Sequence, residues 1–256
     1  MALCAPGRAR VLGPTYAEHA RTAALAGHTV EEGRAPEELR GADLAIVVNP
    51  NNPDGRLFSH GTLIDLADDL ERKGGLLVVD EAFMDAAPKG ASLAAETGRR
   101  NVVVLRSFGK FFGLAGVRLG FALAHPDVAK ALATYFGPWA VSGPALELGL
   151  SALGDARWHD ATRRRLADDA RRLDTILAGA GLKVEGGTTL FRFAAHPRAG
   201  GLAAWLGARG ILVRTFSWRD TALRFGLPGT EAEWRRLEAA TAGWRNATEH
   251  MEDNAA

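Results

Sequence analysis

The chain has 256 residues, of which 47% are hydrophobic, so it can form one or two domains with a sizeable core. Its 31 basic and 30 acidic residues nearly balance, which gives no reason to expect a nucleic acid or a membrane as partner. Cys4 is the only cysteine, which excludes an intrachain disulfide and a Cys-rich metal site and fits a reducing cytoplasm. No apolar run reaches the ~18 residues that a membrane span needs. We therefore expect a cytoplasmic protein without a metal.

The first half of the chain alternates short apolar runs with segments of helical periodicity. Apolar strands without polar alternation, joined by helices, indicate an α/β fold whose mostly parallel sheet is covered on both faces. The expected strands are residues 10–12, 43–48, 76–79 and 101–106, and the expected helices are 16–26 and 59–73.

Polar residues begin where these apolar runs end. The turn that follows Val48 is rich in Asn and Pro, Asp80 follows Val79, and Ser107 lies shortly after Leu105. Ligands of open α/β sheets bind at the carboxyl ends of the strands. We therefore expect the loops after these three runs to converge on one site.

The second half of the chain has a different pattern, which predicts a smaller C-terminal α+β domain. The expected helices are 127–133, 144–153, 157–180, 202–208 and 231–242, and the expected strands are 190–193, 211–214 and 223–226. The predicted domains are a major domain over 1–137 and a small domain over 138–256.

The segment from Arg106 to Gly120 carries the residues best suited to chemistry. Lys110 lies in a loop of small residues, with Ser107 before it and Arg118 after it. A partly desolvated lysine amine attacks carbonyl groups, and an arginine presents a planar set of donors to phosphate oxygens. These residues predict a covalently held aldehyde cofactor whose phosphate is bound by the same loop.

Several motifs along the chain are similar to those of fold-type-I, aminotransferase-like pyridoxal-phosphate enzymes, and the resemblance covers nearly its whole length. Within this family the chain most resembles the L-threonine-O-3-phosphate decarboxylases of cobalamin biosynthesis. The motifs are Pro-Thr-Tyr-Ala-Glu-His at 14–19, Asp-Glu-Ala-Phe at 80–83, Gly-Pro-Trp at 137–139, Val-Ser-Gly-Pro at 141–144 and Leu-Arg-Phe-Gly-Leu-Pro-Gly at 223–229.

The resemblance implies pyridoxal 5'-phosphate as the cofactor and gives roles to residues of the lysine segment. Lys110 matches the Schiff-base lysine, which also serves as general base or acid at the substrate carbon. Asp80 matches the aspartate that pairs with the protonated ring nitrogen and keeps the ring an electron sink. Ser107 and Arg118 match the ligands of the cofactor phosphate.

Further residues match by position. Asn52 corresponds to an asparagine that donates to the phenolic oxygen of the cofactor, although Asp54 replaces the threonine usual in that turn. Tyr16 falls where an aromatic ring stacks on the cofactor, and His19 matches a histidine that bonds the ring-pairing aspartate in some members.

Two arginines and one phenylalanine concern the substrate and the reaction. Arg224 matches the arginine that binds the substrate α-carboxylate, and Arg214, on the neighbouring predicted strand, is a candidate for the substrate carboxylate or phosphate. Phe83 replaces a tyrosine found in many transaminases, which favours the decarboxylase branch.

The resemblance also implies a longer N-terminal part than this chain shows. Relatives have a Gly-Ser loop at a helix N-terminus, whose backbone N–H groups bind the cofactor phosphate. We find no such loop ahead of Gly7 and Arg8 and expect one side of the phosphate site to be missing.

The leading functional prediction is decarboxylation of L-threonine O-3-phosphate, a small phosphorylated amino acid, to (R)-1-aminopropan-2-yl phosphate in cobalamin biosynthesis. Two alternatives stay open at this point: an aminotransferase of the histidinol-phosphate type, and an inactive truncated fragment. The resemblance further implies a homodimer.

Overall fold

The computed structural model describes residues 1 and 4–253 of the chain, with side chains described as far as residue 245. The chain divides into two compact units, Met1–Ala156 and Arg157–Ala256. The domain boundary predicted after residue 137 lies earlier than this division and stays a prediction.

The first unit is built on a six-stranded sheet with the order β2-β1-β3-β4-β5-β6. Its strands are β1 Arg8–Leu12, β2 Thr29–Gly33, β3 Leu44–Val48, β4 Leu76–Asp80, β5 Val102–Ser107 and β6 Gly120–Ala124. β1 to β5 are parallel, and β6 pairs with β5 in the antiparallel direction. This confirms the predicted α/β fold with a mostly parallel sheet.

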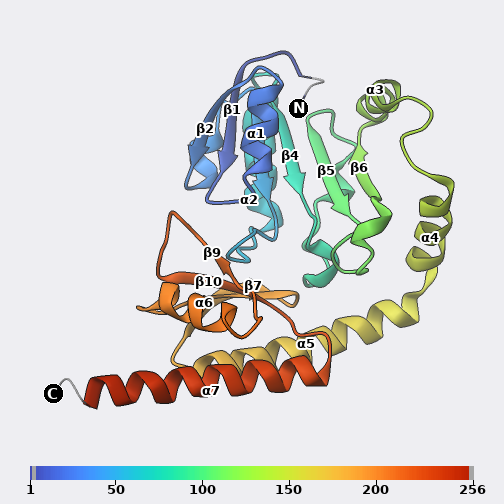
Figure 1. Ribbon diagram of the computed structural model, residues 1–256. Helices are drawn as coiled ribbons and strands as arrows, with labels where there is room; N and C mark the ends of the chain where they lie inside the picture. The colour runs from blue at the N-terminus through green and yellow to red at the C-terminus, as the bar shows by residue number, and fades with distance from the viewer. Residues whose placement is uncertain (2–3, 254–256) are drawn as a thin grey trace. The chain divides into compact units, whose positions relative to one another are not determined.

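Helices cover both faces of this sheet (Figure 1). The α-helices are α1 Glu18–Leu25, α2 His60–Glu71, α3 Pro126–Phe136 and α4 Gly143–Gly154, and short 3-10 turns cover Pro36–Leu39, Met84–Ala86, Ala94–Glu96 and Ala115–Val117. β3 shows why helices are needed on both faces. Ala45 and Val47 pack in the cluster that includes α2, whereas Leu44 and Ile46 pack in the cluster that includes Ala23 of α1.

The second unit has an antiparallel sheet with the order β7-β8-β10-β9. Its strands are β7 Lys183–Thr188, β8 Phe191–Ala195, β9 Arg214–Thr215 and β10 Ala222–Gly226, and its helices are α5 Ala156–Gly179, α6 Ala199–Gly207 and α7 Glu231–Asp253. This confirms the smaller α+β part predicted for the second half.

One apolar cluster joins the helices of the second unit to one face of its sheet. Leu173 of α5, Leu202 of α6, Trp234 of α7 and Leu223 of β10 all belong to it. α5 and α7 lie side by side (Figure 1), where Arg172 pairs with two glutamates of α7 and stacks over the Trp234 ring. The other face of the sheet carries the arginines discussed below.

Three strands were missing from the sequence prediction, and one was misplaced. β2, β6 and β7 had not been expected, and β9 begins at Arg214 instead of Ile211. The first predicted helix also begins later than expected, so Tyr16 precedes α1. All four strands lie at the edges of the two sheets, and β2 and β7 contain the charged residues and glycines that weaken a strand signal.

Candidate active site

The loops that follow the parallel strands of the first unit meet at one edge of the sheet, as predicted. β1, β3, β4 and β5 are consecutive neighbours in the sheet. The loop after β1 is bonded to the loop after β3, since Thr15 Oγ1 donates to Asn51 Oδ1 at 2.6 Å and Asn51 Nδ2 donates to Pro14 O at 3.1 Å. The backbone N–H groups of Asn49 and Glu81 bond to Asp80 O and Leu105 O, which joins the next two loops.

Asp80 and His19 form a close, nearly buried pair at this edge of the sheet. His19 Nε2 lies 2.7 Å from Asp80 Oδ2, and the two side chains are only 9% and 14% exposed. The other carboxylate oxygen, Oδ1, accepts the Ala82 N–H at 2.9 Å. A nearly buried carboxylate is costly without hydrogen-bond partners, and here each of its two oxygens has one. Sequence analysis predicted both residues.

Tyr16 lies beside this pair. Its ring meets the His19 ring edge to face, with centroids 5.6 Å apart, and about half of the tyrosine is exposed. The exposed part of the ring is available to a ligand, so stacking on the cofactor stays a prediction.

Lys110 is exposed, while aromatic residues fix its backbone. Phe108 and Phe111 on either side are almost completely buried, and Phe108 stacks on Phe112 at 4.3 Å. The Lys110 amine lies 5.8 Å from the centre of the Phe83 ring, within the range of a cation–π contact. Since Phe83 follows Asp80 closely in the chain, this contact connects the loop of the lysine with the loop of the aspartate.

Ser107 and Arg118 lie at adjoining ends of β5 and β6. Ser107 is opposite Gly120 in the register, and the Phe108 N–H bonds to Leu119 O at 3.1 Å. Ser107 Oγ accepts the Gly109 N–H at 3.4 Å. The structure therefore brings the two expected phosphate ligands to neighbouring strand ends.

Arg118 has an unusual backbone. Its φ of 58° makes it the sole non-glycine residue with positive φ in the described part of the chain, and its guanidinium donates to Ala115 O at 3.2 Å. A left-handed conformation is uncommon for such a residue and costs of the order of 1 kcal/mol. The strain fits a position where the direction of the side chain matters.

The Asn-rich turn after β3 is organised by Asn51, which sequence analysis did not single out. Asn51 is buried and bridges the loop after β1 to Asp54, whose Oδ1 accepts from Asn51 Nδ2 at 2.8 Å. Asp54, which replaces the usual threonine, also pairs with Arg56. Asn52, the expected ligand of the cofactor, is half-buried beside this network, and its role stays a prediction.

Sequence analysis also missed a buried ionic network beneath the loop after β4. Glu81 is fully buried and accepts from Ser92 Oγ and the Leu93 N–H, each at 2.6 Å, and from Arg106 at 3.2 Å. Arg106 also pairs with Asp85. Burial raises the pKa of Glu81, and the bonds from its partners oppose this rise. An acidic residue directly after a strand, with an arginine on the next strand, was the available signal.

The two arginines expected to bind substrate lie in the second unit, on neighbouring strands. Arg224 of β10 and Arg214 of β9 are directly opposite in the register. Burial, and secondly the positive charge of Arg214, lower the pKa of Arg224. Like charges placed opposite each other repel, which makes this face of the sheet attractive to an anion.

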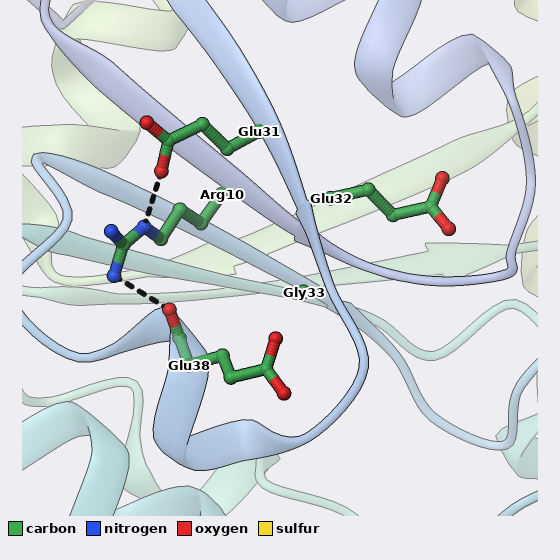
Figure 2. A pocket seen from close by; sticks show the side chains of 5 residues that line it. All are labelled: Arg10, Glu31, Glu32, Gly33 and Glu38. Carbon is green, nitrogen blue, oxygen red and sulfur yellow. Dashed lines mark hydrogen bonds and ion pairs between the residues drawn. The ribbon is translucent and has the colours of Figure 1, made fainter.

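A pocket of about 250 Å³ opens elsewhere in the first unit, lined by Arg10, Glu31, Glu32, Gly33 and Glu38. Figure 2 shows Arg10 between Glu31 and the carbonyl oxygen of Glu38, to which it donates at 2.8 and 2.6 Å. These bonds occupy its guanidinium and hold β1 to β2 and the following turn. The pocket contains none of the predicted site residues.

The donor set of the first unit fits a pyridoxal phosphate. An exposed amine suits the aldehyde, a nearly buried carboxylate held by a histidine suits the protonated ring nitrogen, and a hydroxyl and a guanidinium suit the phosphate. In the described residues we find no group of His, Cys, Asp or Glu suited to a metal ion and no helix long and apolar enough to cross a membrane.

Comparisons with known proteins show the family of the chain. A family model that describes aminotransferase class I and II matches residues 1–238, so the chain belongs to that family. This confirms the expected class, the pyridoxal-phosphate enzymes of the aminotransferase type.

Three known proteins show which members of this family the chain is similar to. The chain is 48% identical to a threonine-phosphate decarboxylase of Pseudomonas aeruginosa, over 93% of this chain and 72% of the relative. It is 32% identical to a histidinol-phosphate aminotransferase of Mycobacterium bovis, over 93% and 68%. A solved histidinol-phosphate aminotransferase of Sinorhizobium meliloti, in complex with pyridoxal-5'-phosphate, has a TM-score of 0.83 and 23% identity over 95% and 72%, which shows the shared fold.

Proposed function

We propose that this chain is a pyridoxal-phosphate-dependent lyase that decarboxylates L-threonine O-3-phosphate to (R)-1-aminopropan-2-yl phosphate in cobalamin biosynthesis. The observation that carries the proposal is the 48% identity to a threonine-phosphate decarboxylase across 93% of the chain. The identity to a histidinol-phosphate aminotransferase is lower, at 32%. The higher identity to the decarboxylase therefore favours the lyase.

Pyridoxal phosphate supplies, when bound, an electron sink for the bond that breaks at the substrate Cα. In this chain Asp80 would hold a proton on the ring nitrogen, because a carboxylate favours the protonated form of its partner. His19, 2.7 Å from Asp80 Oδ2, fixes the orientation of that carboxylate. Ser107 and Arg118 would bind the phosphate.

Lys110 would hold the cofactor and then move a proton. Lys110 is exposed, the nearby Phe108 and Phe111 are buried, and the Phe83 ring lies 5.8 Å from Nζ. Decarboxylation leaves a carbanion at Cα that must be protonated, and the positioned lysine amine is the general acid available for this step.

Arg224 and Arg214 would bind the anionic groups of the substrate. A phosphorylated amino acid carries a carboxylate and a phosphate, and two guanidinium groups side by side match two anionic groups. A decarboxylase has to bind its carboxylate without stabilising the ground state more than the transition state.

An aminotransferase of the histidinol-phosphate type is the second candidate, favoured by the similarity to such enzymes in sequence and fold. The two reactions differ in the bond that breaks at Cα, to the carboxylate or to hydrogen. We also propose a homodimer that works in the cytoplasm, in line with the family resemblance.

The products decide between the two reactions. The purified protein is incubated with pyridoxal phosphate and L-threonine O-3-phosphate, beside a Lys110→Ala control. The lyase releases CO2 and an amine, whereas an aminotransferase gives a keto acid and consumes an amino acceptor. A keto acid without CO2 would overturn the lyase proposal.

A further inference from the structure

The pairing of the short strand β9 with β10 does little to fix the position of Arg214. β9 has only two residues, Arg214 and Thr215. Arg214 lies directly opposite Arg224, so repulsion between the two like charges weakens the pairing of β9 with β10. Other contacts must therefore keep the two arginines together.

The two arginines lie on the face of the sheet that is turned away from the helices. Residues directly opposite each other in an antiparallel pair share a face. Arg214, Arg224 and Phe193 of β8 are opposite one another across three strands. The next pair, Thr215 and Leu223, points to the other face, and Leu223 is buried in the core with the helices.

The residues that follow β9 fold over this same face. The rings of Phe216 and Trp218 both contact the Phe193 ring, with centroids 5.6 and 6.2 Å away, and Trp218 stacks on Phe193 with an interplanar angle of 12°. Phe193 is 2% exposed, whereas Trp218 is 46% exposed. The loop thus forms an aromatic wall beside Arg224, with one side of Trp218 open to a ligand.

An ion pair fixes the far end of this loop to the opposite edge of the sheet. Arg219 Nη1 lies 2.7 Å from Glu185 Oε2 on β7, and the Arg219 guanidinium also lies 5.6 Å from the centre of the Phe193 ring. The bond from Arg219 lowers the pKa of Glu185, which is the expected effect of a stable pair. The loop is therefore anchored at β7 and β8 and carries β9 at its start.

We propose that Glu185 and Arg219 are positioning residues, which hold the β9–β10 loop across the sheet so that Arg214 and Arg224 bind the two anionic groups of one substrate. Trp218 is the side wall of that site and limits the substrate to a small molecule that carries both anions on a short carbon chain. This inference rests on the proposed function, because it takes the arginine pair as the substrate site.

The experiment measures binding without the reaction. L-threonine O-3-phosphate is titrated into the cofactor-free full chain by calorimetry, for the wild type, Glu185→Gln, Arg219→Gln and the exchanged pair Glu185→Arg/Arg219→Glu. Displacing one binding group by about an ångström has large effects at such sites, so each single variant should bind about tenfold more weakly or worse. The exchanged pair restores the attraction and should recover most of the affinity.

A control removes an exposed ion pair within one helix of the same unit, which joins no two elements. Asp168 pairs with Arg171 on the exposed surface of α5, and Asp168→Asn should leave the affinity unchanged. Melting temperatures are recorded for every variant. A loss of affinity in the single variants with recovery in the exchanged pair supports a positioning role, since a general loss of stability would not be reversed in this way.

Two results would overturn the inference: wild-type affinity in both single variants, or no binding by the wild type. The positioning role and the proposed reaction can fail independently of each other. If the wild type binds L-threonine O-3-phosphate and the single variants do not, but no CO2 is released by the cofactor-loaded protein, the reaction is wrong and the positioning role stands.

Discussion

His19 Nε2 lies 2.7 Å from Asp80 Oδ2, although the two residues are 61 positions apart in the chain. α1 carries the histidine and the end of β4 carries the aspartate, so the pair depends on the fold of the whole first unit. The aspartate is thus oriented by two hydrogen bonds and nearly shielded from water, which suits the predicted pairing with a protonated ring nitrogen.

Replacing His19 should therefore weaken cofactor binding. In His19→Ala, Asp80 loses one of its two bonds, and a hydrogen bond to a charged group contributes about 1.5–3 kcal/mol. We expect the Kd for pyridoxal phosphate to rise about tenfold or more. The Kd is measured by absorbance titration. His60→Ala, which removes a more exposed histidine–carboxylate pair with Glu96, is the control and should keep the wild-type Kd. Equal Kd values for His19→Ala and wild type would contradict a role for the pair.

Arg214 should stabilise the substrate complex at a cost to the free protein. Arg214→Gln removes a like charge opposite Arg224, which is worth about 0.2–1 kcal/mol, so the variant should melt at an equal or higher temperature. Its KM for L-threonine O-3-phosphate should nevertheless rise about tenfold or more, because an ion-paired contact to the substrate is lost. Calorimetry and steady-state kinetics test both parts. A lower melting temperature with an unchanged KM would show that Arg214 is structural.

Glu81 should give the stability of the first unit a distinct pH dependence. Burial raises its pKa above 4.5, so the folded state binds this proton more tightly than the unfolded state. The stabilisation from protonation is therefore complete below about pH 4.5 and is lost as the pH rises through the raised pKa. Compared with Glu81→Gln, the wild type should lose relative stability over that window in urea unfolding.

Glu185 supplies a control of opposite sign. The bond from Arg219 lowers the pKa of Glu185, so its stabilisation is present above the ordinary value and is lost as the pH falls through the lowered pKa. The difference between wild type and Glu185→Gln should therefore grow as the pH rises. A difference between wild type and Glu81→Gln that does not vary with pH would refute the assignment for Glu81.

The sequence predicted the interior of both sheets better than their edges. β3, β4 and β5 are buried on both faces and read as continuous apolar runs, such as Leu44–Val48. β2 and β7 contain glutamates and glycines, because an edge strand has one unpaired side and keeps polar residues there. The predicted strand at 211–214 began too early. Ile211 and Val213 are apolar because they pack on the core, and they are not paired in the sheet.

The sequence likewise predicted only part of the candidate site. Lys110 and Asp80 could be found because the chemistry of a cofactor needs those residue types close after the ends of strands, whereas His19 was predicted through the family resemblance. The network of Glu81 and Arg106 was missed, although an acidic residue after one strand and an arginine on the next hinted at it, because the pair forms only where β4 and β5 are neighbours. The anchoring of Arg219 to Glu185 depends in the same way on the order of strands in the second sheet.

The central claim, that Lys110 holds pyridoxal phosphate in a site completed by Asp80, is tested most directly by an absorbance titration of the purified chain. Pyridoxal phosphate is added to the wild type, Lys110→Ala and Lys89→Ala, the last replacing another exposed lysine of the first unit. We predict a saturable visible band in the wild type and in Lys89→Ala, and none in Lys110→Ala. A band of equal intensity in all three, or in none, would contradict the claim.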